Sequence, residues 1–291
     1  MDGKQARRTN TSSPLGMMFD HGCDAVVTFL FACGLGSLVG LGKRNVKLDS
    51  VGWFTTLWIM ICVPFFLNTW EEFYTGELNF PIFHGVSEGT VIACIVINLS
   101  GFFGKELWLS KVSLGFATMQ LNHFLVILSF FSGLGFGLYS VYNVITKYNE
   151  KRREAVGNLA IFLFMVCTLF IVINFSAADS VILQQYPKVI IILYGFAFSK
   201  LVGHLQLAHA CDSVFMQYRK SLLTTFFCLA AVSLLKHFWG IHIVDIDYLI
   251  IAFLVMHVVV WAHFAYYLTE ELCEVLGIYR FSTEKRTNKN K

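Results

Sequence analysis

The chain has 291 residues, of which 56% are hydrophobic and 14% are charged, and its mean hydropathy is +0.63. Soluble domains carry roughly 25% charged residues, so this composition excludes a soluble domain and indicates a membrane protein. The net charge of +3 is small, and no nucleic-acid partner is expected. The eight cysteines form no C-x-x-C pair, which argues against a zinc site or a disulfide framework.

The first 24 residues carry carboxylates and glycines at fixed spacing. From Asp2 to Asp24 they read D-G-x-x-A-R-x8-G-x3-D-x3-D. Asp20 and Asp24 are four residues apart, so on a helix both point to one face, with Gly16 one turn earlier. Two carboxylates one turn apart repel each other unless a cation lies between them. Hard oxygen ligands suit Mg²⁺ or Mn²⁺, ions that usually work with phosphates, and Arg7 can grip a phosphate bidentately.

Eight apolar stretches occupy most of the remaining chain. They cover residues 25–42, 51–70, 89–104, 124–146, 158–178, 189–211, 222–239 and 248–269. A helix needs about 20 residues to cross the hydrocarbon, so the third and seventh stretches are the weakest candidates. The runs lack the strict alternation of a membrane barrel. The sequence therefore predicts an all-α polytopic bundle of about eight transmembrane helices over residues 1–281, followed by a polar cytosolic tail at 282–291.

The distribution of Lys and Arg predicts the orientation. With eight spans both termini lie on one side, and that side holds 14 of these residues against 7 on the other, with Lys200 inside a span. Positive residues concentrate in the cytosol. The motif and both termini are therefore expected to face the cytosol.

These features resemble a known family. The pattern is similar to the signature of the CDP-alcohol phosphotransferases, membrane enzymes of the CDP-alcohol phosphatidyltransferase class. The residues between the signature positions resemble the choline/ethanolamine phosphotransferase branch, and in this chain they read D-G-K-Q-A-R-R-T-N-T-S-S-P-L-G and then F-D-H-G-C-D. All seven signature positions match: Asp2, Gly3, Ala6, Arg7, Gly16, Asp20 and Asp24. The stretches around Trp70 and Gly85 also resemble that branch.

The resemblance implies a reaction. A CDP-choline or CDP-ethanolamine would give its phospho-alcohol to diacylglycerol, and CMP would leave. Two Mg²⁺ or Mn²⁺ ions held by Asp2, Asp20 and Asp24 would clamp the pyrophosphate. The implied nucleotide-binding positions are Asp2, Gly3, Ala6, Arg7 and Gly16. The implied location is the membrane of the endoplasmic reticulum or Golgi, where membrane lipids surround the protein. The resemblance also implies a homodimer as a candidate assembly.

Two further residues are candidates for the chemistry. Attack on phosphorus by a lipid hydroxyl benefits from a base. In this branch the residue matching His21 is a proposed base, and Glu88 matches a glutamate thought to work with it. The alternative for His21 is a histidine that bonds a carbonyl, and for Glu88 it is ordinary capping of a helix start.

One departure from the family pattern predicts a truncated chain. The family has another Asp three residues before Asp2, and about ten spans. The alternative function is therefore an inactive truncated member that acts as a non-catalytic membrane partner, and the chain alone is expected to turn over poorly.

Other polar residues in the spans have two interpretations. Glu71 and Glu72 follow the second apolar stretch and are predicted to be interface charges without a function. Lys200 and His204, one turn apart, could meet a lipid phosphate or a carboxylate, or could snorkel. The pairs Gly36/Gly40 and Gly133/Gly137 predict close helix packing.

Overall fold

The computed structural model describes residues 5, 8–10, 13–42, 49–76, 87–113, 115, 118–147, 152–215 and 219–279, with the backbone alone at 49, 50, 87, 88 and 152. Its elements, in chain order, are α2 (Pro14–Leu38), α3 (Asp49–Thr75), α4 (Ser87–Phe103), α5 (Glu106–Leu109), β1 (Lys111–Ser113), β2 (Thr118–Gln120), α6 (Leu121–Lys147), α7 (Arg152–Ser176), α8 (Val181–Gln185), α9 (Lys188–Ala210), α10 (Lys220–Trp239) and α11 (Ile246–Leu276).

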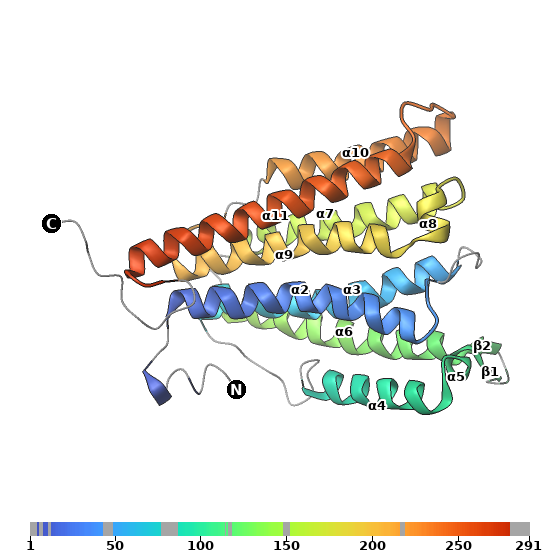
Figure 1. Ribbon diagram of the computed structural model, residues 1–291, viewed down its shortest axis with the longest axis horizontal. Coiled ribbons are helices and arrows are strands. Elements are labelled where there is room, and N and C mark those ends of the chain that lie inside the picture. Colours follow the sequence, from blue (N-terminus) through green and yellow to red (C-terminus); the bar gives the residue numbers. More distant parts are fainter. Residues whose placement is uncertain are drawn as a thin grey trace.

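The long helices lie roughly parallel in one bundle, and α2 begins at the same side of it at which α11 ends (Figure 1). Seven of the described helices are long and apolar enough to cross a membrane, and α4 is a shorter apolar helix. The prediction of an all-α polytopic membrane bundle is confirmed, and the third predicted span is indeed the short one. The protein is a multi-pass membrane protein.

The helices pack in pairs through their buried faces. Helix α3 packs against α6, α2 against α9 and α3, α7 against α10, and α9 against α11. Helix α9 is the most enclosed of the seven spans, with 72% of its most apolar stretch buried. Beta strands β1 and β2 form a small antiparallel hairpin that pairs Val112 with Met119 before α6.

Local sequence signals explain the helix ends. Ser13 caps α2 by accepting a hydrogen bond from the Gly16 amide at 3.1 Å, and Pro14 fits the first turn because its missing N–H would have no partner there. Helix α2 therefore begins eleven residues before the apolar stretch at 25. This early start places Asp20 and Asp24 inside the helix.

The glycine pairs allow close packing. A Cβ on Gly36 would lie 2.4 Å from the Phe54 ring, and one on Gly137 would lie 2.9 Å from Leu67. Gly40 instead follows the end of α2 and has φ +78°, a conformation that favours glycine, although a Cβ there would still lie 3.1 Å from Leu109 of α5. Close packing between elements is therefore found at Gly36, Gly133 and Gly137, where a Cβ on Gly133 would lie 3.3 Å from the Met60 carbonyl oxygen, and at Gly40 it accompanies a turn.

Candidate functional site

The carboxylate face of α2 lies at the end of the bundle where α2 begins and α11 ends. Gly16, Asp20 and Asp24 are all exposed residues of α2 (Pro14–Leu38). Asp20 and Asp24 are separated by one helical turn, so the two carboxylates share a face as the spacing predicted. The opposite face, which includes Ala25 and Phe29, is buried in the bundle.

The other predicted nucleotide and metal positions lie outside the described residues. These are Asp2, Gly3, Ala6 and Arg7. Glu88 is the second residue of α4, and its side chain also lies outside the described part of the structure. Of the predicted site, the structure therefore brings together Gly16, Asp20, His21 and Asp24 on α2.

Two carboxylates suit a divalent cation, although the described set is incomplete. Within the described ranges, no group of three or more His, Cys, Asp or Glu side chains is arranged to hold a metal ion. Asp20 and Asp24 nevertheless supply hard, solvent-accessible oxygens on a rigid helix, which is the donor chemistry that Mg²⁺ and Mn²⁺ prefer. These residues fit such an ion, with the third predicted ligand, Asp2, outside the described part.

His21 makes two contacts that fix which ring nitrogen carries hydrogen. Its Nδ1 lies 3.0 Å from the Met17 carbonyl oxygen. A carbonyl oxygen only accepts, so Nδ1 donates and Nε2 is the nitrogen available to take a proton. The alternative of a histidine bonded to a carbonyl is thus correct for Nδ1, and it leaves Nε2 available for the base role.

Glu72 faces that second nitrogen. Its Oε2 lies 3.6 Å from His21 Nε2, and the two side chains are only 14% and 19% exposed, respectively. The same oxygen accepts a hydrogen bond from Gln206 Nε2 at 3.2 Å. Three helices, α2, α3 and α9, therefore meet at one carboxylate, and a proton on Nε2 would be stabilised by its negative charge.

Glu71 is buried on an adjacent face of α3, about 100° round the helix from Glu72. It is 0% exposed, and its Oε1 accepts a hydrogen bond from Asn143 Nδ2 of α6 at 2.9 Å. Its second oxygen is buried and has no hydrogen-bond partner among the described residues. The prediction that Glu71 and Glu72 are interface charges is wrong, because α3 continues to Thr75 and turns both carboxylates into the bundle.

Further bonds hold this end of α3 against α7. Trp70 Nε1 donates to the Ala155 carbonyl at 3.1 Å, and Asn158 Nδ2 donates to the Tyr74 hydroxyl. Trp70 is 0% exposed, so its indole N–H would be costly to leave without an acceptor. Helix α3 is thus anchored on both sides of Glu72, which fixes where that carboxylate meets His21.

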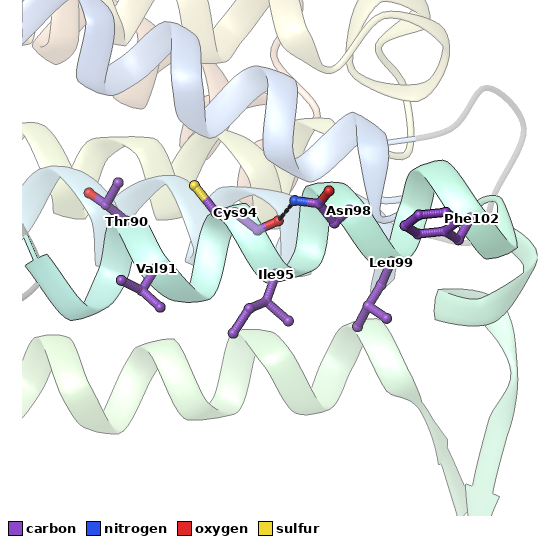
Figure 2. A pocket seen from close by; sticks show the side chains of 7 residues that line it. All are labelled: Thr90, Val91, Cys94, Ile95, Asn98, Leu99 and Phe102. Atoms are coloured by element: carbon purple, nitrogen blue, oxygen red, sulfur yellow. Dashed lines mark hydrogen bonds between the residues drawn. The ribbon is translucent and has the colours of Figure 1, made fainter.

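A groove along α4 lies away from these residues and carries little chemistry. It encloses about 480 Å³ along α4 and is lined by Thr90, Val91, Cys94, Ile95, Asn98, Leu99 and Phe102. Figure 2 shows Val91, Ile95 and Leu99 pointing to one side of α4 and Asn98 bonding back to the Cys94 carbonyl at 2.8 Å. The groove is an apolar surface of the bundle and includes no predicted site residue.

Comparison with known proteins identifies the family. A profile described as CDP-alcohol phosphatidyltransferase matches residues 1–69, which span the whole motif and most of α3. Choline/ethanolaminephosphotransferase 2 of Arabidopsis thaliana is 30% identical over 302 residues, covering 98% of this chain and 75% of the relative. Choline/ethanolaminephosphotransferase 1 of the same plant is 28% identical over the same shares.

A human relative matches a smaller part. Ethanolaminephosphotransferase 1 of Homo sapiens is 30% identical over 210 residues, or 68% of this chain and 49% of the relative. The profile, the plant relatives and the motif on α2 point to the same group of proteins. The chain therefore belongs to the CDP-alcohol phosphatidyltransferase family, in its choline/ethanolaminephosphotransferase branch.

Proposed function

We propose that this chain transfers phosphocholine or phosphoethanolamine from a CDP-alcohol to diacylglycerol, giving phosphatidylcholine or phosphatidylethanolamine and CMP. The observation that carries the proposal is the contact between His21 and Glu72, which lies on the same helix turn as the two carboxylates. The relatives' names support phosphotransferase chemistry. They give no support to the alternative of a non-catalytic membrane partner.

His21 acts as the general base in this proposal. The diacylglycerol hydroxyl gives its proton to Nε2 of His21 as its oxygen attacks the phosphorus of the phospho-alcohol. A new P–O bond forms, the bond between that phosphorus and the bridging oxygen breaks, and CMP leaves with the electron pair. Glu72 stabilises the imidazolium, and Gln206 holds the Glu72 carboxylate in place. Positioned bases of this kind contribute roughly 10²–10⁴-fold to rate.

The remaining groups bind the donor. Asp20 and Asp24, with Asp2, would hold Mg²⁺ or Mn²⁺, which would neutralise the phosphate charge of the bound nucleotide. Arg7 would pair with a phosphate, and Gly3, Ala6 and Gly16 would leave room for the nucleotide against the helix. Glu88 is proposed as a second carboxylate for the base. A homodimer, a membrane of the endoplasmic reticulum or Golgi, and a cytosolic motif stay predictions.

The test is a CMP-release assay in membranes whose own choline/ethanolaminephosphotransferases have been deleted. Asp20→Asn and Asp24→Asn should each abolish Mg²⁺- or Mn²⁺-dependent turnover while the protein stays in the membrane. Asp179→Asn is the matched control, because Asp179 is an exposed carboxylate at the other end of the bundle, 3.0 Å from Lys236. Near-normal turnover of either α2 variant would refute the metal assignment.

A further inference from the structure

A group of basic side chains on α9 and at the start of α10 takes no part in the proposed reaction. Lys200 and His204 are one turn apart on α9, and Arg219 precedes α10. All three are partly buried. Lys200 stands ten residues from the end of α9, roughly 15 Å along the helix axis, so its charge lies well inside the apolar part of the bundle.

The three side chains are close enough to interact electrostatically. Arg219 repels the Lys200 ammonium, and both lie within range of the His204 ring. Among the described residues, no acidic side chain acts on any of the three. Like charges brought together in a low-dielectric setting are costly unless an opposite charge lies between them.

Arg219 has a buried hydrogen-bond donor, its Nε, without an acceptor among the described residues. Burial also lowers the pKa of the guanidinium, so the charge is maintained against a desolvation cost that a bound anion would offset. The guanidinium lies 6.0 Å from the ring centroid of Phe215, which is itself buried.

The basic group faces away from the His21–Glu72 contact. Gln206, which bonds Glu72, is two residues beyond His204 and therefore points about 200° round α9. The His204 ring instead packs against Phe264 of α11, with ring centroids 4.2 Å apart. On the same α11 face, His257 lies within electrostatic range of Lys200. The α9 part of the basic group thus lies on the side of α9 that faces α11.

We propose that Lys200, His204 and Arg219 form a binding site for a phosphate-bearing anion, distinct from the carboxylate face of α2. Phosphate has oxygens for both a guanidinium and an ammonium, and Arg binds it bidentately. Simple snorkelling does not explain the group, because a snorkelling lysine gains by reaching water alone, whereas this ammonium is repelled by a second, partly buried cation. The phosphate comes either from a lipid head group or from solution.

The experiment measures the melting temperature of the purified full chain in nanodiscs. One arm compares phosphatidylcholine nanodiscs with and without phosphatidic acid. A second arm adds inorganic phosphate to phosphatidylcholine nanodiscs, against chloride of equal ionic strength. The variants are Lys200→Met and Arg219→Gln. Lys188→Met is the control, because Lys188 is the exposed first residue of the same helix.

The wild type and Lys188→Met should gain on the order of a few degrees from the anion in at least one arm. Lys200→Met and Arg219→Gln should lose that gain, and Lys200→Arg should keep it. A gain in the lipid arm alone assigns the phosphate to a head group, and a gain in the solution arm alone assigns it to a soluble anion. No gain in either arm, or an equal gain in every variant, overturns the proposal. If Lys200→Met fails to fold, Arg219→Gln, which alters a residue outside the helices, carries the same comparison.

Discussion

The hydrogen bond between Glu71 and Asn143 is the sharpest test of how α3 is held. Replacing Asn143 with Leu keeps the approximate size of the side chain but removes the donor 2.9 Å from the Glu71 carboxylate. Glu71 is 0% exposed and Asn143 is 7% exposed, so water cannot replace the lost donor without opening the contact. The variant therefore strands a buried polar group between α3 and α6.

The expected cost is about 2–3 kcal/mol. Interhelical hydrogen bonds in membrane proteins average about 0.6 kcal/mol, so the bond itself is the smaller part. Leaving a buried acceptor without a partner costs roughly 1–3 kcal/mol more, and here the other Glu71 oxygen already has no partner among the described residues. Removing both groups should restore much of the loss, because an apolar pair needs no hydrogen bond.

The assay is thermal unfolding of the purified protein in detergent. Asn143→Leu should lower the melting temperature by on the order of 6 °C, and Glu71→Leu/Asn143→Leu should recover to within about 1 kcal/mol of the wild type. Asn174→Leu is the control, because Asn174 is exposed and its side chain bonds the Phe170 carbonyl of its own helix. A melting temperature of Asn143→Leu equal to that of the wild type, or a double variant equal to the sum of the two single ones, would refute the reasoning.

Three further outcomes are expected. Glu72→Gln should lower turnover about ten-fold with little change in KM, since about 1.4 kcal/mol of the imidazolium's stabilisation would be lost. Glu271→Gln, which alters an exposed carboxylate on α11, should leave turnover unchanged, and equal turnover of the two variants would contradict the role of Glu72. Gly195→Ala should destabilise by about 1–3 kcal/mol, because its Cβ would lie 2.3 Å from the buried Phe29 ring, whereas Gly34→Ala, with no neighbour within 4 Å, should be tolerated. Tags at Lys291 and beside Arg152 should both be cut by a protease added to the cytosolic side of sealed microsomes. Protection of either tag would contradict the predicted topology.

The sequence predicted the helical architecture and the carboxylate face because both depend on local spacing. Apolar length identifies spans, and a separation of four residues places Asp20 and Asp24 on one face whatever surrounds them. The beginning of α2 was harder to predict, because its Ser13 cap and its first turns lie outside the apolar run.

The partner of His21 could not be predicted in the same way. Glu72 lies 51 residues away on another helix, and its contact depends on the rotation of α3 against α2. A signal was nevertheless present, because two carboxylates directly after an apolar run are costly if the helix continues and then require partners in the bundle. The prediction failed because Glu71 and Glu72 were taken to end the span as interface charges, whereas α3 continues to Thr75.

The short helix α4 has a consequence for the surrounding lipid. Its 17 residues span about 25 Å, whereas a typical hydrocarbon core is about 30 Å thick. Helix α6, with 27 residues, is long enough to cross the full thickness, so we expect the bilayer to thin beside α4 or polar groups to be drawn inward at its ends. Helix α4 lies at one edge of the bundle (Figure 1). The lipid around the protein is therefore expected to be asymmetric, and the stability of the protein should depend on the acyl-chain length of the host membrane.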